Sequence, residues 1–192
     1  GIQGKRVFRV TVEGEENHAG TSPRALRKDA LVASVDILSA LHKLTHDPDD
    51  TVKFTVGFLE VSPNAPSVVP SLVHFSIDLR HPDTEILSSL GDAIPALCEE
   101  HRGPCNVQMK ELSNDPSLEF PAAIRDVIRD VVVGLDIAHM ELPSAAGHDA
   151  RHLHYVCPTG MIFVPCAGGI SHNEAESCKA EDLFNGTQVL AG

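Results

Sequence analysis

The stretch KRVFRVTVE, residues 5–13, decides the fold of the first half of the chain. Its apolar residues Phe8, Val10 and Val12 occupy alternate positions, and polar residues stand between them. A period of two is typical of a β-strand with one buried face, because successive side chains of a strand point to opposite sides of the sheet. We therefore predict a half-buried strand here, around which the neighbouring elements are arranged.

A helix is predicted after this strand. Ser22 is placed to cap its first turn, and Pro23 suits the first helical position, where a backbone N–H would have no partner in any case. We expect this helix to end near His46. Its apolar stripe, at helical spacing, consists of Leu26, Ala30, Ala33, Ile37, Leu41 and Leu44.

The rest of this unit has three more strands and one more helix. Residues 52–58 and 73–79 have the pattern of two strands, and we expect them to pair as neighbours across the proline-rich turn 62–70. A second helix is expected from about 83 to 101, and a last strand from 107 to 112. The predicted order is β-α-β-β-α-β, a single sheet backed by two helices.

The composition changes after SNDP, residues 113–116, where we place a junction between domains 4–113 and 114–192. Beyond it, an amphipathic helix that includes Ile124 closes at Gly134, and the apolar run 161–164 predicts a strand covered on both faces. The second unit is thus expected to be α/β. Both ends of the sequence interrupt a predicted element, so we expect the chain to be a piece of a longer protein.

Composition excludes several classes of function. At 192 residues, 42% hydrophobic and 22% charged, the chain resembles ordinary globular proteins. A net charge of -12 without a basic stripe argues against a nucleic-acid partner, and no apolar run has the roughly 20 residues of a membrane-spanning helix. Without a signal-peptide pattern, the expected compartment is the cytoplasm. No Cys-x-x-Cys pair occurs, and we expect free thiols at Cys98, Cys105, Cys157, Cys166 and Cys178.

Two short polar segments carry candidate functional histidines. NHAGTSP, residues 17–23, places His18 on a turn whose small neighbours leave the ring accessible. SAAGHDA, residues 144–150, places His148 beside Asp149, ahead of a predicted helix. Taken singly, the first histidine is more typical of a surface turn, and the second segment is as typical of a helix start as of an active site.

A third segment, GGISHNEAE at residues 168–176, places His172 after the apolar run 161–164. Loops at the carboxyl ends of strands are where α/β folds bind ligands. A neutral imidazole near carboxylates suits zinc, although Glu174 and Glu176 are equally typical of solvated charge. Because zinc centres need at least three protein ligands and His172 has no close histidine partner in the sequence, the residues alone do not define a metal site.

With two further motifs, these segments resemble one enzyme family. LEVSPNAPSVVP begins at Leu59 and IDLRHPD at Ile77, and with NHAGTSP, SAAGHDA and MIFVPCAGGISHNEAE they occur in the order and at the spacing of that family. The chain resembles the N-carbamoyl-L-amino-acid hydrolases and the similar allantoate amidohydrolases and β-ureidopropionases of the zinc aminoacylase and carboxypeptidase clan. The resemblance covers essentially all 192 residues.

This resemblance implies a domain plan and a cofactor. A smaller lid domain, here residues 4–113, forms the homodimer, and residues 114–192 belong to the catalytic domain. The catalytic domain holds two divalent metals, expected to be Zn²⁺, with Mn²⁺, Co²⁺ or Ni²⁺ as alternatives. The remaining metal ligands and the general-base glutamate are expected before Gly1, so the chain is expected to be incomplete as a hydrolase.

The implied reaction is hydrolysis of the carbamoyl or ureido C–N bond of a small ureido acid. A peptidase or aminoacylase of the same clan and a stand-alone dimerisation module are the two alternatives. By the same resemblance His172 is a metal ligand, and His18 and His148 are catalytic histidines that also contact the substrate. A histidine that donates to the scissile carbonyl would stabilise the oxyanion formed on it.

The resemblance also implies substrate binding by Arg80, Ser67 and Gly147. The planar guanidinium of Arg80 suits bidentate pairing with a substrate carboxylate. Without the resemblance, a strand-end ion pair with Asp78 or Asp83 would be the preferred interpretation of this arginine. Ser67 stands where many relatives have asparagine, so a hydroxyl replaces an amide for carboxylate recognition.

Overall fold

The computed structural model describes residues 1–192 and contains two compact units, Gln3–Ser117 and Gly1–Ile2 with Leu118–Gly192. Helices and strands are mixed, as the predicted α/β class requires. None of the helices combines the length and the apolar character needed to cross a membrane. In chain order the elements are β1 (Gly4–Glu13), β2 (Asn17–His18), η1 (Arg24–Leu26), α1 (Ala30–Leu44), β3 (Lys53–Thr55), β4 (Leu59–Ser62), β5 (Val68–Val69), β6 (Leu72–His81), α2 (Thr84–His101), β7 (Asn106–Asp115), α3 (Ala122–Gly134), α4 (Ala150–His154), η2 (Ala167–Gly169) and α5 (Ala180–Ala191).

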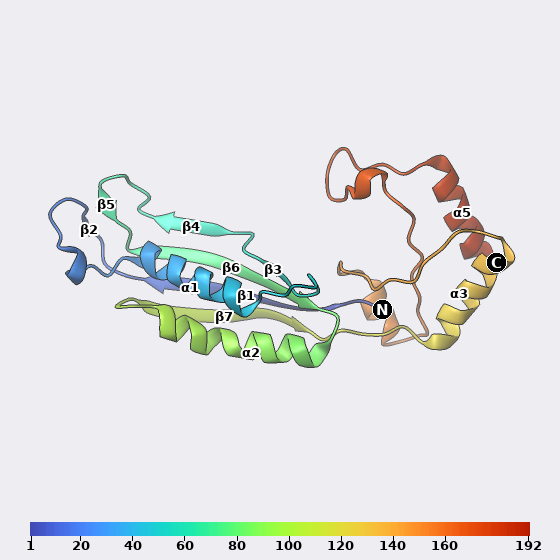
Figure 1. Ribbon diagram of the computed structural model, residues 1–192, viewed down its shortest axis with the longest axis horizontal. Coiled ribbons are helices and arrows are strands. Elements are labelled where there is room, and N and C mark those ends of the chain that lie inside the picture. The colour runs from blue at the N-terminus through green and yellow to red at the C-terminus, as the bar shows by residue number, and fades with distance from the viewer. The chain divides into compact units, whose positions relative to one another are not determined.

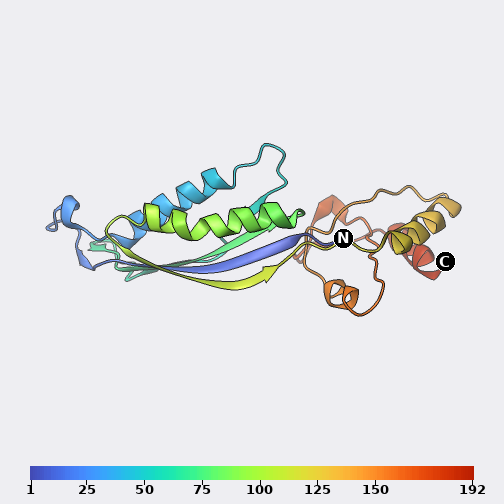
Figure 2. The same ribbon diagram turned by 90° about the horizontal axis from the view of Figure 1, so that it is seen from below.

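The unit Gln3–Ser117 is built on a five-stranded antiparallel sheet (Figure 1). β1 lies between β6 and β7, and the short strands β3 and β4 both pair with the other side of β6. The predicted pairing of residues 52–58 with 73–79 is confirmed through β3, which covers only Lys53–Thr55 of the first segment, and β4 is a further short strand just after that segment. Helices α1 and α2 lie side by side on one face of the sheet, which confirms the predicted β-α-β-β-α-β plan (Figure 2).

The core of this unit lies between the sheet and the two helices. Phe8, Val10 and Val12, whose alternation predicted the strand, are each at most 1% exposed. Burial of one such side chain stabilises the folded state by about 1.5–3 kcal/mol relative to its exposure to water. The other large core residues are Ile37, Leu41, Val73, Phe75, Ile77, Leu79, Leu87 and Ile94.

The start of α1 corrects the prediction from Ser22 and Pro23. Residues Arg24–Leu26 form only a single 3-10 turn, and α1 begins at Ala30. Asp29 is the cap, because its carboxylate accepts the backbone N–H groups of Leu31 at 3.0 Å and Val32 at 3.1 Å. A short carboxylate that satisfies two amides of the first turn defines a helix start better than a serine seven residues earlier.

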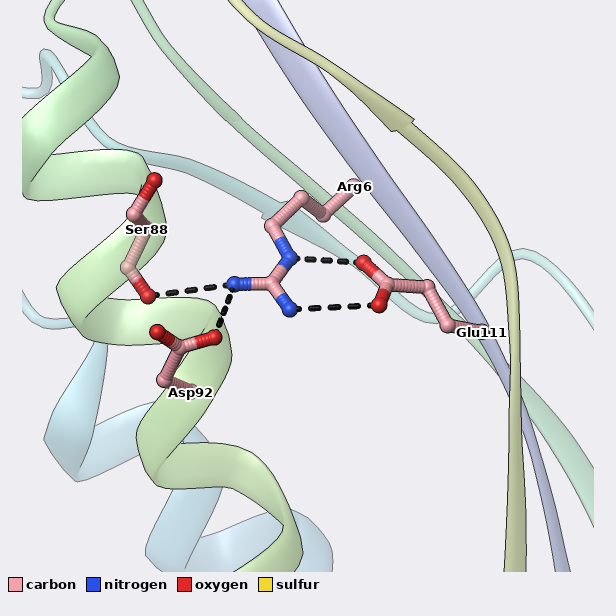
Figure 3. A network of polar contacts seen from close by, with 4 residues as sticks. All are labelled: Arg6, Ser88, Asp92 and Glu111. Carbon is pink, nitrogen blue, oxygen red and sulfur yellow. Dashed lines mark hydrogen bonds and ion pairs between the residues drawn. The ribbon is translucent and has the colours of Figure 1, made fainter.

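A charged residue lies on the helix-covered face of the sheet, at Arg6 of β1 (Figure 3). Its Nε donates to Glu111 Oε1 at 2.7 Å and its Nη1 to Asp92 Oδ1 at 2.7 Å, so β7 and α2 both contact one guanidinium. Gly91 of α2 leaves the necessary space, since a Cβ there would lie 2.4 Å from Arg6 Nη1. This glycine, which weakens the helix in isolation, is therefore required by packing.

The second unit has a smaller core around Ile2, Phe120 and Ala150. Ile2 joins this unit through backbone hydrogen bonds with Leu118, at 2.9 and 3.0 Å, and through a bridge to Ser144. The predicted amphipathic helix is confirmed as α3, which ends at Gly134. α3 and α5 pack against each other.

The predicted strand at residues 161–164 is wrong, because this apolar run belongs to no sheet. A strand needs a neighbour for its backbone N–H and C=O groups, and no other segment of residues 1–192 lies beside it in a ladder. Val164 instead lies against α5, since a Cβ on Gly186 would come within 2.5 Å of its Cγ1, whereas Phe163 is exposed.

Candidate functional site

His18 lies where β2 meets a tight turn, and the structure determines which ring nitrogen carries its proton. The ring nitrogen Nδ1 lies 2.9 Å from the backbone N–H of Gly20 and 3.2 Å from that of Thr21, and accepts from both. In a neutral imidazole the accepting nitrogen carries no hydrogen, so the proton is on Nε2. His18 is exposed and therefore presents an N–H donor to solvent.

Two contacts hold the His18 turn in place. β2 pairs with β5, with His18 opposite Val68, and the N–H of Ala19 donates to the carbonyl of Ser67 at 2.9 Å. Ser67 is thus a direct neighbour of the histidine turn, and this serine is exposed. Arg27 closes the other side, because its Nη2 donates to the carbonyl of Ala19 at 2.6 Å. Arg27 was not predicted as a support of this turn, because no local sequence pattern marks it.

Arg80 lies on the polar face of β6, and its nearest charged partner is Asp78. Its Nε donates to Asp78 Oδ1 at 2.7 Å and its Nη2 to Oδ2 at 3.0 Å, a bidentate pair. This hydrogen bonding raises the pKa of Arg80. The ion-pair interpretation is confirmed for Asp78 but not for Asp83, whose carboxylate instead caps α2.

His18 and Arg80 lie at opposite ends of the sheet unit. The β2–β5 pair lies next to the end of β6 that begins at Leu72, whereas β3 pairs with Arg80 at the other end (Figure 1). The eight residue steps from Leu72 to Arg80 span about 26 Å at roughly 3.3 Å per residue. One amino-acid-sized molecule therefore cannot contact His18 and Arg80 of the same chain.

His148 resembles His18 in its local hydrogen bonding. Its Nδ1 accepts the backbone N–H of Ala150 at 2.9 Å, so this ring also carries its proton on Nε2 and is exposed. The helix predicted after it is confirmed as α4. Gly147 beside it is exposed, and a Cβ there would meet no atom within 4 Å, so packing within this chain does not require a glycine.

His172 lies at the tip of a loop between η2 and α5, in the left-handed backbone region with φ 56°. Its backbone N–H donates to Glu176 Oε2 at 3.0 Å, and its imidazole is exposed. The exposed carboxylate of Glu176 thus contacts the backbone of His172 and not its ring. No three His, Cys, Asp or Glu side chains of residues 1–192 gather closely enough to hold a metal, so the residues of this chain do not by themselves fit a metal centre.

With this geometry in place, the comparisons with known proteins identify the family. Residues 2–192 match the model of peptidase family M20/M25/M40. The chain belongs to this family. It is 35% identical over 191 residues to the N-carbamoyl-L-amino-acid amidohydrolase of Paenarthrobacter aurescens, an alignment that covers 98% of the chain and 46% of that protein.

Other members of the family are similar to the chain to a comparable extent. The chain is 34% identical over 196 residues to the allantoate amidohydrolase of Escherichia coli K12, covering 99% of the chain and 47% of that protein. A hydantoinase/carbamoylase family amidase from Burkholderia vietnamiensis has a similar structure, with a TM-score of 0.88 and 32% identity over 98% of the chain and 46% of the amidase. The resemblance predicted from the motifs is confirmed. The chain spans about half the length of these relatives.

Proposed function

We propose that the complete protein hydrolyses the carbamoyl or ureido C–N bond of N-carbamoyl amino acids or similar ureido acids. Hydrolysis of an N-carbamoyl amino acid takes up water and releases the amino acid, ammonia and carbon dioxide. Family membership and the names of the relatives support this proposal. The structural observation behind this proposal is that His18 and His148 both accept a backbone N–H at Nδ1. Each therefore presents an Nε2–H donor.

The donors would act on the group whose charge changes during hydrolysis. When water adds to a ureido carbonyl, negative charge develops on the carbonyl oxygen, and an N–H fixed in advance stabilises that charge without reorganisation. Backbone amides hold both rings from the Nδ1 side, so neither Nε2–H depends on a flexible partner. Loss of one such donor typically lowers kcat about 10²- to 10³-fold.

Arg80 is proposed to bind the carboxylate of the ureido acid, with Gly147 as a further substrate contact and with Ser67 contributed by the chain that contributes His18. Asp78 holds the Nε side of the guanidinium, which fixes the plane of the fork. A substrate carboxylate would pair with this guanidinium in the bidentate geometry that arginine favours. In this arrangement Asp78 acts as a positioning residue for Arg80.

The metal assignment remains part of the proposal. Membership of this family supports a metal-dependent reaction, because its amidohydrolases generally require a metal. We propose two divalent ions per subunit, Zn²⁺ in the first instance, with His172 as the ligand that this chain contributes. The ion would supply a Lewis acid for the carbonyl. Residues 1–192 hold no group of three ligands, so His172 would need ligands from elsewhere in the complete protein to bind an ion.

We further propose that the unit Gln3–Ser117 is the lid and dimerisation domain of a cytoplasmic homodimer, and that the second unit belongs to the catalytic domain. The separation of His18 from Arg80 along β6 supports a dimer, because two copies related by a twofold axis can place His18 of one opposite Arg80 of the other. Each substrate would then contact both chains.

The function is tested by product analysis on the complete protein. With an N-carbamoyl-L-amino acid and with allantoate, we expect ammonia release that depends on added protein and stops when the metal is removed with a chelator. A peptidase or aminoacylase of the same family would release no ammonia from these substrates and would cleave dipeptides or N-acetyl amino acids instead. Cleavage of dipeptides or N-acetyl amino acids, with no ammonia released from the ureido substrates, would overturn the proposal.

A further inference from the structure

Two thiols close the neck of the loop that carries His172. Cys166 precedes η2 and Cys178 lies just before α5, and their Sγ atoms are 3.7 Å apart. Beside them the N–H of Ala167 donates to the carbonyl of Ser177 at 2.7 Å. The two segments are therefore hydrogen-bonded at the point where the thiols meet, and both thiols are partly exposed to small reagents.

The other three cysteines lie in different surroundings. Cys98 and Cys105 are buried in the core of the sheet unit, and burial raises the pKa of both thiols, that of Cys98 to about 11. Cys157 is exposed, and its sulfur lies 3.7 Å from the hydroxyl of Thr159. Only Cys166 and Cys178 face each other across a loop.

The thiol pair is also connected to the histidine at the loop tip. The Sγ of Cys166 lies 4.0 Å from Glu176 Oε1, while the other oxygen of this carboxylate, Oε2, accepts the N–H of His172 at 3.0 Å. A single carboxylate thus contacts the neck and the tip of the loop. A change at Cys166 would reach the backbone of His172 through this one side chain.

We propose that Cys166 and Cys178 form a reversible disulfide that closes the His172 loop under oxidising conditions. The oxidant is a small-molecule disulfide, RSSR, of the glutathione type. One cysteine thiolate attacks RSSR, forms a mixed disulfide and releases RSH; the second thiolate then attacks the protein sulfur of that mixed disulfide and releases a second RSH. RSSR is reduced, the two cysteines are oxidised, and their two protons leave on the released thiols.

The geometry allows this bond with little change in the loop. The sulfurs of a disulfide are about 2.0 Å apart, so the two thiols must approach by about 1.7 Å, a distance that rotation of two side chains can supply. The bond would join residues whose backbone neighbours are already paired, and it would remove the thiol hydrogen that faces Glu176. We expect the loop to be more tightly restrained in the oxidised form.

The bond itself does not depend on the proposed function. Its effect on a metal ligand does, because that effect requires His172 to hold a metal. If His172 is a ligand, the oxidised protein should lose its metal to a chelator more slowly than the reduced protein. The test of the bond therefore uses peptide mapping, which requires neither metal nor activity.

The complete protein is reduced, freed of reductant and incubated with oxidised glutathione at about pH 8.5, where more of each thiol is ionised. After alkylation, trypsin with glutamyl endopeptidase separates residues 152–174, which contain Cys166, from residues 177–179, which contain Cys178. We expect these peptides to be joined, at about tenfold or more the level in a dithiothreitol-treated sample.

Residues 152–174 also contain Cys157, so the mapping is repeated with Cys157→Ser, in which the joined peptides should persist. The joined peptides should be absent from Cys178→Ser. When the wild type is oxidised in urea, they should no longer be more abundant than peptides joined through other cysteine pairs. Glutathione retained on Cys166 or Cys178 without joined peptides would overturn the proposal. A link through Cys157, lost in Cys157→Ser, would overturn it equally.

Discussion

At the scale of the residue, Arg80 is the side chain whose proposed role is most open to test. In the complete protein, Arg80→Lys keeps the charge but loses the planar fork, so kcat/KM for an N-carbamoyl amino acid should fall, and Arg80→Ala should lower it further. Loss of a desolvated charge-assisted pair costs about 2–5 kcal/mol, or roughly 30-fold to several-thousand-fold in kcat/KM. Steady-state kinetics measures the effect.

The control for Arg80 compares two substrates and two arginines. A substrate amide that lacks the carboxylate should be poor with the wild type and almost indifferent to Arg80→Ala, because the contact is already absent. Arg9→Ala, which removes an arginine that stacks on Phe58 instead, should leave kcat/KM for the acid nearly unchanged. Equal loss on acid and amide would reduce Arg80 to a structural partner of Asp78.

Because Arg6 packs against Gly91, we predict that Gly91→Ala changes the free energy of unfolding in opposite directions in the wild type and in the Arg6→Ala protein. Alanine in place of a helical glycine stabilises by up to about 1 kcal/mol, but here the new Cβ would lie 2.4 Å from the guanidinium. We expect Gly91→Ala to destabilise the wild type by about 1–3 kcal/mol and to stabilise the Arg6→Ala protein. Urea denaturation measures both, and an equal effect in the two backgrounds would show that Arg6 is not the cause.

Sequence patterns predicted the accessibility of single residues better than their hydrogen bonds. The small neighbours of His18 predicted an exposed ring, and the structure confirms this. The position of its proton was not predictable, because it depends on the N–H directions of Gly20 and Thr21. The role of Arg27 was not predictable for a similar reason, since it donates to backbone carbonyls of the turn.

At the scale of the element, the N-cap of α2 makes stability depend on pH. The backbone N–H groups of Ile86 and Glu85 donate to the Asp83 carboxylate and lower its pKa below the ordinary value of 3.8. A pKa lower in the folded state than in the unfolded state stabilises above the unfolded pKa, and this stabilisation is lost as pH falls through the folded pKa.

Asp83→Asn removes this dependence on protonation while keeping a residue that can cap. The stability advantage of the wild type over Asp83→Asn should therefore be largest near neutral pH and should shrink below about pH 4, as urea denaturation at a series of pH values would measure. A pH-independent difference at Asp83 would contradict the account of this cap.

Elements marked by their own hydrophobic periodicity were predicted well. Elements that depend on pairing with a strand elsewhere in the sequence were not. The alternation in β1 and the stripes of α1 and α3 are local patterns, and each element formed. The start of α1 was misplaced because Asp29 competes with Ser22 as a cap, and helical periodicity does not distinguish the two. The apolar run 161–164 has the composition of a strand but no neighbour to pair with.

At the scale of the whole molecule, the central claim is that one substrate contacts His18 and Arg80 from two different chains. Sequence motifs placed both residues in one family pattern but could not show their separation, which arises from the register of β5 and β3 along β6. A site shared between copies would make dimerisation a condition of activity. Residue substitutions alone do not test this, since each would lower activity in either arrangement.

The most direct measurement is complementation between His18→Ala and Arg80→Ala chains. With the two chains carrying different affinity tags, the mixed dimer is isolated and its ammonia release is compared with that of both parent dimers. A mixed dimer has one site with both residues intact and one site that lacks both, so we expect about half of the wild-type activity from two nearly inactive parents. A mixed dimer as inactive as its parents would contradict the shared site.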